Sequence, residues 1–162
     1  MEVTGDEKMM EKITDPTKLR HWEGKIEAYW VYTSGKAGDY FFKRLKEEGK
    51  FTAAKCRKCG KVYFPPRIYC ERDFEETEFI DVSGEGEVRS FTIARLDPYE
   101  RELPKPQIYA LIHIYGTDGS LIHLLGEVEP ENVKIGMKVR PVLKPKEERE
   151  GRITDVLYFK PA

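Results

Sequence analysis

The chain has 162 residues, with 28 Lys and Arg against 29 Asp and Glu, which gives a formal net charge of −1. Charged residues make up 35% of the chain and hydrophobic residues 40%, so we expect a folded globular protein rather than a disordered one. No apolar run approaches the roughly 18 residues of a membrane span, and the charged start lacks the apolar core of a signal peptide. A basic excess that would hold nucleic acid through its phosphates is also missing. We therefore expect a cytoplasmic protein that has no membrane partner, and we do not expect nucleic acid as a partner.

The first fifty residues are predicted to form an N-terminal extension, domain 1–50. A charged lead over residues 1–20 precedes the aromatic, extended stretch "KIEAYWVYTSG". The next stretch, "DYFFKRLKEEG", has helical periodicity, with Asp39 as the expected N-cap and Gly49 as the expected stop. A helix of about nine residues is marginal alone and must dock on something.

This extension carries more aromatic side chains than one short helix and one strand would bury. Clustered Trp and Tyr are typical of protein interfaces, so we predict that these residues dock on a partner. The alternative is that they simply cover the rest of the fold. The residues concerned are Tyr29, Trp30, Tyr32, Tyr40, Phe41 and Phe42.

Residues 51–80 contain the stretch "CRKCGKVYFPPRIYCERD" and are predicted to form a zinc ribbon. In a C-x2-C turn two thiolates converge on one ion, and a second turn brought back by a hairpin completes a tetrahedron. Here the second turn reads C-x2-D, and a carboxylate oxygen can replace the fourth thiolate. The predicted ligands of a closed, structural zinc site are Cys56, Cys59, Cys70 and Asp73.

Three other interpretations of these cysteines stay open on the sequence alone. They could be small buried hydrophobic residues, or Cys56 and Cys59 could form a disulfide, which a cytoplasmic location disfavours. The ribbon could also keep its fold without a metal, which would leave Asp73 an ordinary surface residue. Iron is less suited to the site, because rubredoxin-type iron ordinarily takes four thiolates.

Residues 81–162 are predicted to form a five-stranded antiparallel barrel of the OB type. Alternating patterns mark strands over 87–96, 107–116 and 120–128, and "GTDG" makes the second and third of these a hairpin. A fourth strand is expected from Lys138 and a fifth over 151–159. The fold class is therefore mainly β with short N-terminal helices, a rubredoxin-like zinc ribbon and an OB-fold barrel.

Three segments carry a resemblance to a known family: "FFKRLKEEGKFTAAKCRKCGKVYFPPRIYCERDF", "GEGEVRSFTIARL" and "LLGEVEPENVKIGMKV". Together they resemble the zinc-ribbon/OB-fold acyl-CoA-associated proteins that accompany thiolase-superfamily enzymes. The similarity covers roughly residues 25–160. Asp73 departs from the family pattern, which usually has Cys at that position.

The resemblance implies an accessory, non-catalytic subunit in a hetero-oligomer. It would dock on and bridge enzymes of the acetoacetyl-CoA thiolase and HMG-CoA synthase type, and it would line part of a coenzyme A site. Candidate ligands of CoA phosphates are Lys58, Lys61 and Arg67, beside the predicted knuckle. The alternative for these three is a solvated basic face.

Independent catalysis is not expected. His113 and His123 lie on the predicted hairpin, yet neither has a carboxylate or nucleophile near it in sequence. A different function, binding of single-stranded nucleic acid, would use Tyr63, Phe64 and Phe91 as stacking platforms. The neutral charge and the lack of Lys and Arg along the barrel strands speak against it.

Overall fold

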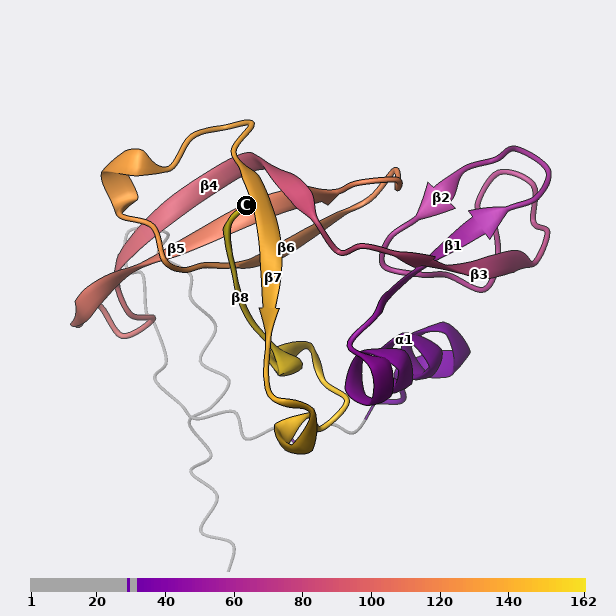
Figure 1. Ribbon diagram of the computed structural model, residues 1–162, viewed down its shortest axis with the longest axis horizontal. Helices are drawn as coiled ribbons and strands as arrows, with labels where there is room; N and C mark the ends of the chain where they lie inside the picture. Colours follow the sequence, from indigo (N-terminus) through magenta and orange to yellow (C-terminus); the bar gives the residue numbers. More distant parts are fainter. Residues whose placement is uncertain (1–28, 30–31) are drawn as a thin grey trace, which may run out of the picture. The chain divides into compact units, whose positions relative to one another are not determined.

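The computed structural model describes residue 29 and residues 32–162 (Figure 1). The charged lead 1–20 and Trp30 lie outside the described residues. The chain divides into two units, Met1–Tyr32 and Thr33–Ala162, and the second contains every element described below. No helix among the described residues is long and apolar enough to cross a membrane.

One α-helix, α1 (Gly35–Glu48), opens the second unit. It begins after Ser34, so the prediction of Asp39 as N-cap is wrong. The helix extends further back because Ala37 continues the buried stripe formed by Phe41 and Leu45 at helical spacing. Its predicted end is confirmed: Gly49 adopts φ 69°, and its N–H donates to the carbonyl of Leu45.

A three-stranded antiparallel sheet follows, with β1 (Phe51–Cys56) between β2 (Val62–Tyr63) and β3 (Thr77–Val82). Strand β1 is buried at five of its six positions, and α1 packs against it. Strand β3 lies in a segment that the sequence marks only as a connection. It is held to α1 by the ion pair between Asp81 and Arg44.

Five strands then close into a barrel, as predicted, and their order around it is β4-β5-β6-β8-β7. Their bounds are β4 (Gly86–Leu96), β5 (Glu102–Ile114), β6 (Ser120–Leu125), β7 (Lys138–Leu143) and β8 (Val156–Pro161). Three short 3-10 turns lie between the later strands: η1 (Pro130–Asn132), η2 (Lys146–Glu148) and η3 (Ile153–Asp155). Neighbouring strands are antiparallel except β6 and β8, which run parallel and share one bridge, Leu125 to Phe159.

The helix, the ribbon sheet and the barrel share one hydrophobic core. Phe51 of β1 is at its centre, since its ring contacts those of Phe41 in α1, Phe64 after β2 and Phe159 in β8 at centroid distances of 6.0, 6.1 and 6.4 Å. Residues 33–162 therefore fold as a single packed body.

The turn between β5 and β6 fixes the ribbon against the barrel. The N–H of Asp118 donates to the carbonyl of Val62 (2.7 Å), and Asp118 Oδ2 accepts the N–H of Val62 (2.8 Å). A Cβ atom on Gly119 would lie 2.0 Å from the carbonyl oxygen of Phe64, so only glycine fits there. The two backbones approach directly, which holds the knuckle region in one position relative to the barrel.

Candidate metal centre

Two turns with the same backbone hydrogen bonds carry the four predicted ligands. In the first, the N–H of Cys56 donates to Lys61 O and the N–H of Gly60 to Cys56 O. In the second, the N–H of Cys70 donates to Glu75 O and the N–H of Phe74 to Cys70 O. The bonds span the same number of residues in both, so Asp73 occupies the place in the second turn that Cys59 has in the first.

The four side chains converge on one point. Their ligand atoms all lie within 4.8 Å of one another. Asp73 Oδ2 is 3.3 Å from the sulfur of Cys56 and 3.4 Å from that of Cys70, and the sulfurs of Cys59 and Cys70 are 3.7 Å apart. Cys56 and Cys70 are buried, whereas Cys59 is exposed.

These distances fit a tetrahedral zinc ion. Zn–S bonds of about 2.3 Å and Zn–O bonds of about 2.0–2.2 Å place tetrahedral ligands about 3.8 Å apart for two sulfurs and about 3.6 Å for a sulfur and an oxygen. The three short separations agree with these values to within a few tenths of an ångström, and the four ligand atoms all lie within 4.8 Å of one another. The cluster is compatible with zinc, and all three thiols are free rather than joined in a disulfide.

Tyr63 supports this cluster from the adjacent strand β2. Its buried hydroxyl lies 3.2 Å from Cys70 Sγ and accepts the N–H of Glu71 (3.3 Å), which leaves the hydroxyl proton free to point at the sulfur. The backbone N–H of Arg72 also donates to Cys70 Sγ, at 3.4 Å. Hydrogen bonds of this kind orient a ligand and tune the metal it binds.

The ionisation of the cluster follows from these contacts. The carboxylate of Asp73 raises the pKa of the Cys59 thiol to about 12, and the thiols of Cys59 and Cys56 lower the pKa of Asp73. Burial tends to raise the pKa of Cys70, but the hydrogen bonds from Tyr63 and from Arg72 N–H outweigh it and lower that pKa. These shifts favour Asp73 and Cys70 as anions and Cys59 as the neutral thiol, so binding of a divalent cation would release the Cys59 proton.

The three candidate phosphate ligands are all near carboxylates. Lys61 and Arg67 both form ion pairs with Glu71, whose pKa they lower, Lys61 more than Arg67. Lys58 Nζ is 3.9 Å from Asp73 Oδ1, whereas the contacts of Asp73 with Cys56 and Cys70 are made by Oδ2. Lys61 and Arg67 line a hollow of about 230 Å³, yet Glu71 and Asp118 line it too. Phosphate binding by these residues stays a prediction.

The predicted docking aromatics differ in their exposure. Phe41 is buried in the shared core and Phe42 packs against it, whereas Tyr40 stacks on Phe79 of β3 and stays 38% exposed. Tyr29 and Tyr32 are exposed residues of the other unit. The helix aromatics Phe41 and Phe42 thus cover the fold, which is the alternative that the sequence left open for them.

The structure separates the two hairpin histidines. In the β5–β6 register His113 is opposite Ser120, and His123 is opposite Ala110. His113 Nδ1 lies 3.0 Å from the carbonyl oxygen of Gly119, within the same hairpin. Two of the three residues considered for base stacking, Tyr63 and Phe64, are buried and so offer no face to a nucleic acid.

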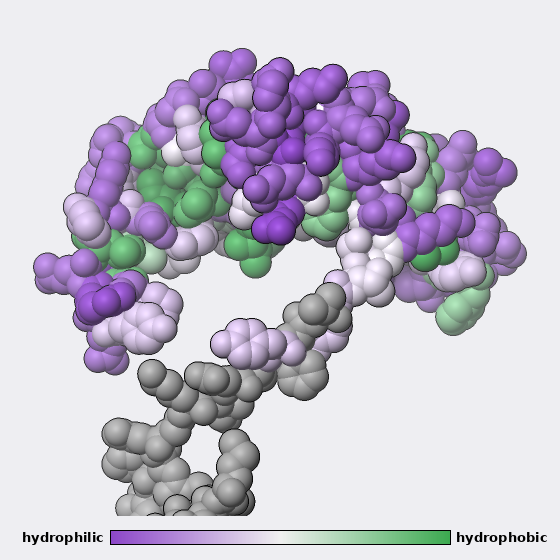
Figure 2. Space-filling view, turned by 90° about the horizontal axis from the view of Figure 1, so that it is seen from below, coloured by the Kyte–Doolittle hydropathy of each residue, from purple (hydrophilic) through white to green (hydrophobic). Residues whose placement is uncertain are grey.

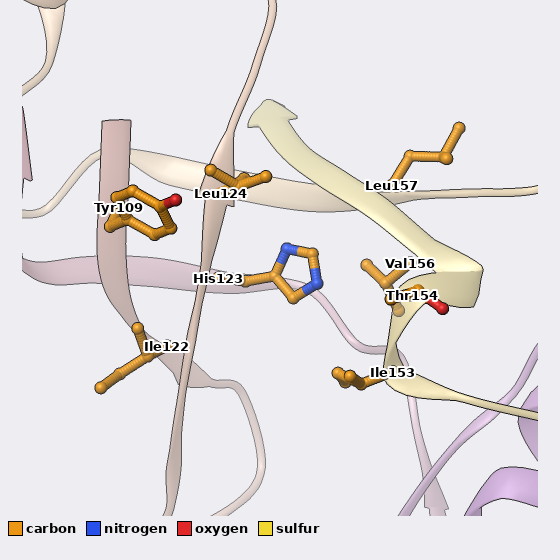
Figure 3. A pocket seen from close by; sticks show the side chains of 8 residues that line it. All are labelled: Tyr109, Ile122, His123, Leu124, Ile153, Thr154, Val156 and Leu157. Atoms are coloured by element: carbon orange, nitrogen blue, oxygen red, sulfur yellow. The ribbon is translucent and has the colours of Figure 1, made fainter. Parts of the chain in front are cut away.

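An apolar groove on the barrel was not predicted from the sequence. Its volume is about 350 Å³, and its residues come from strands β5, β6 and β8 and from η3 (Figure 3). Alternation along 120–128 gave the signal for one exposed strand face, but the pairing of β6 with β8 that opens the groove is set by topology. The lining residues are Tyr109, Ile122, His123, Leu124, Ile153, Thr154, Val156 and Leu157.

Two family models match adjoining parts of the chain. Residues 45–78 match the rubredoxin-like zinc ribbon domain of ChsH2, and residues 79–144 match the C-terminal OB-fold domain of ChsH2. The prediction of a zinc ribbon followed by an OB fold is confirmed.

Curated relatives and solved structures agree with these matches. A DUF35 domain-containing scaffold protein of Methanocaldococcus jannaschii is 33% identical over 125 residues, which are 74% of this chain and 87% of the relative. Another from Pyrococcus furiosus is 32% identical over 128 residues, 75% of this chain and 90% of the relative.

Among solved structures, a DUF35-family protein of unknown function from Sulfolobus solfataricus has a TM-score of 0.61 at 29% identity, over 79% of this chain and 87% of that one. The Ltp2-ChsH2(DUF35) aldolase has a TM-score of 0.59 over 78% of this chain and 95% of that one. At 19% sequence identity, this likeness concerns the fold alone.

Proposed function

Because this chain belongs to the family of DUF35 domain-containing scaffold proteins, we propose that it is a non-catalytic subunit of an acyl-CoA enzyme complex. It docks on and bridges enzymes of the thiolase superfamily, of the acetoacetyl-CoA thiolase and HMG-CoA synthase type, in the cytoplasm. The zinc ribbon gives the scaffold a rigid end and takes no part in chemistry.

One observation carries this proposal: the reactive groups and the open surface of the protein are in different places. The three thiols and Asp73 belong to one four-donor cluster, and a zinc ion held by four protein atoms has no open position for a substrate. The apolar groove on the barrel is lined by one imidazole, and none of the described residues that line it carries a thiol or a carboxylate. Such a surface suits binding better than catalysis.

We propose Cys56, Cys59, Cys70 and Asp73 as the ligands of the structural zinc. A bound zinc ion would cross-link the two turns. Asp73 binds it through Oδ2, since that oxygen faces the thiols, while Oδ1 faces Lys58. Coenzyme A enters the proposal only as a ligand of the partner enzyme. A CoA phosphate that reached Lys61 or Arg67 would have to displace Glu71.

Native co-purification tests the proposal. The full chain, tagged and produced in its source organism, is expected to co-elute with a thiolase-superfamily subunit identified by mass and to carry about one zinc per chain. The purified chain alone is expected to turn over no acyl-CoA. A chain that elutes without such a subunit, or that cleaves or condenses acyl-CoA by itself, would contradict the proposal.

A further inference from the structure

The groove on the barrel exists because two neighbouring strands separate. Strands β6 and β8 share one bridge, Leu125 to Phe159, and the N–H of Gly126 donates to Phe159 O (2.8 Å). Toward the start of both strands no further pairing follows among the described residues. Side chains from both strands and from η3 line the resulting gap (Figure 3).

Apolar surface continues from the groove across β5 to the end of β4. A second hollow of about 380 Å³, lined in part by Leu96, Pro98 and Leu103, shares Tyr109 with the groove. We call the five exposed residues around these two hollows the barrel face: Leu96, Tyr109, Ile122, Ile153 and Leu157. Figure 2 shows hydrophobic residues gathered on this side of the barrel.

The barrel face is large for a surface that stays in water. Its side chains are exposed by between 36% and 70%. They present on the order of 500 Å² of surface, near the upper end of the patches found on monomers, which are often functional. One partner in a standard protein interface buries about 800 Å², so the barrel face with a polar rim matches the size of one side of a stable interface.

The charge of this surface restricts what it can bind. Asp97 is the one charged residue that lines the two hollows, and its carboxylate is held by Arg101 and by the N–H of Tyr99. A basic or acidic segment would find no counter-charge there. The complementary surface is uncharged and apolar.

His123 adds a polar feature to the groove. Its imidazole extends from β6 into the gap toward Thr154 and Val156 (Figure 3). Its Nδ1 atom is buried and, within the described part of the chain, has no hydrogen-bond partner of normal geometry, although backbone groups of Ile153 and Leu124 interact with the ring. Buried polar atoms without good partners are rare in native proteins, so a hydrogen-bonding group that a partner protein brings to this ring would improve its contacts.

We propose that the barrel face is a docking surface for a partner protein, which places an uncharged branched or aromatic side chain in the groove and a hydrogen-bonding group against His123. This inference rests on the proposed function in that the partner is the enzyme that the scaffold holds. The interface excludes water from the groove, and its central anchor dominates the affinity.

A charge placed on the face tests this inference. Ile122→Glu introduces a carboxylate at the rim, where the side chain is 70% exposed, so the fold tolerates it. Ile135→Glu is the matched control, because Ile135 is also 70% exposed and lines neither hollow. With the purified native partner we expect Ile122→Glu to raise the dissociation constant at least about 30-fold. Ile135→Glu should raise it less than about threefold. Equal affinities for both variants would overturn the inference.

His123→Phe separates binding from folding. The aromatic ring keeps its packing on Phe159 (5.7 Å between centroids) and loses the buried nitrogen atoms. We expect an unchanged or higher melting temperature for the free chain together with about tenfold weaker partner binding. Full binding by His123→Phe would show that the groove floor does not meet the partner.

Hydrogen exchange of the native complex distinguishes this inference from the proposed function. Protection of residues 120–125 by a partner outside the thiolase superfamily would support the barrel face and overturn the proposed function. A thiolase-superfamily partner that leaves residues 120–125 as exchangeable as in the free chain would support the proposed function and overturn the barrel face as its docking surface. A dimer of this chain alone that Ile122→Glu dissociates would replace the proposed partner by a second copy.

Discussion

The ribbon tip and the barrel differ in what stabilises them. Among the described residues, the buried cluster at the tip consists of Ala54, Cys56, Tyr63 and Cys70, with Phe79 packed against it, and two of the four are proposed metal ligands. The barrel and the elements packed on it bury fifteen residues in one cluster, most of them Val, Ile, Leu and Phe. Apolar burial of that extent can stabilise a fold without a metal, whereas four small or polar side chains cannot.

The chain therefore has two levels of stability within one packed body. Phe51 connects the two regions, so the base of the ribbon shares the stability of the barrel core. The tip beyond it, which carries both turns, depends on cross-linking by the metal. Changes to the tip and changes to the barrel should therefore have separable effects on stability.

Loss of a buried ligand should have the largest effect. Cys56→Ala removes a completely buried donor from the four-donor cluster, and a structural zinc site contributes on the order of 10 kcal/mol to folding. We expect zinc to fall from about one ion per chain to near zero. Amides of residues 56–76 should lose hydrogen-exchange protection while those of β4 keep theirs.

The matched variant is Asp73→Cys, which supplies a fourth thiolate and should keep the zinc. Full hydrogen-exchange protection of the tip in Cys56→Ala, or wild-type protein that contains no zinc by elemental analysis, would show that the tip is stable without a metal.

The next effect concerns a buried carboxylate on the barrel side. Asp155 is fully buried and accepts the backbone N–H groups of Glu150, Gly151 and Arg152. Asp155→Asn places an amide N–H against at least one of these donors. We expect a loss of about 2–4 kcal/mol in the free energy of unfolding, measured by urea denaturation at pH 7.

The pH dependence of this loss has a definite sign. Burial tends to raise the pKa of Asp155, but the three N–H donors outweigh it, so the folded-state pKa lies below the usual value. Its stabilisation is complete above the unfolded pKa of about 3.9 and is lost as the pH falls through the folded pKa. The difference between wild type and Asp155→Asn should therefore shrink below about pH 4. A difference that is constant from pH 7 to pH 2 would contradict this cause.

Much of this fold is readable from local sequence patterns. Alternation placed strand β4 and the starts of β6 and β7 within one residue, because each has one face on the core. The strand expected over 120–128 ends at Leu125, and the one expected over 151–159 begins at Val156, after η3. Strand β5 begins five residues earlier than expected, since it continues through Pro104 and Pro106, which the sequence indicates as breaks. Strand β3 was missed because its partner β1 comes from 26 residues earlier in the chain.

The candidate metal site was readable for a different reason. The two turns are local, so residue spacing alone places Cys56 beside Cys59 and Cys70 beside Asp73. Tyr63 was missed as a supporting residue, and so was the groove, because both depend on contacts between segments. Spacing does not report that the hydroxyl of Tyr63 reaches Cys70, or that β6 and β8 diverge.

A smaller effect is expected when the hydrogen bond to Cys70 is removed. Tyr63→Phe keeps the ring and deletes the hydroxyl that contacts Cys70 Sγ and accepts the N–H of Glu71. Loss of such an outer contact typically weakens metal binding about 10- to 100-fold. Chelator competition measures this change, and Tyr69→Phe is the control, since the side chain of Tyr69 is exposed. Equal zinc affinity in the two variants would assign Tyr63 to packing alone.

The smallest expected effect lies in the backbone of the second turn. Phe74 adopts φ 57° where the equivalent Gly60 of the first turn adopts φ 76°, and its side chain is 83% exposed. Phe74→Gly removes the strain of a left-handed conformation and loses little buried surface, so we expect the tip to gain about 0.5–1 kcal/mol against local opening. Gly60→Ala is the reciprocal change: nothing lies within 4 Å of the added Cβ, so only the backbone strain acts, and the tip should lose about 1 kcal/mol. Hydrogen-exchange protection of residues 56–76 measures both changes and should rise in Phe74→Gly and fall in Gly60→Ala. If protection moved in the same direction in both variants, the two turns would be alike in hydrogen bonding but not in energy.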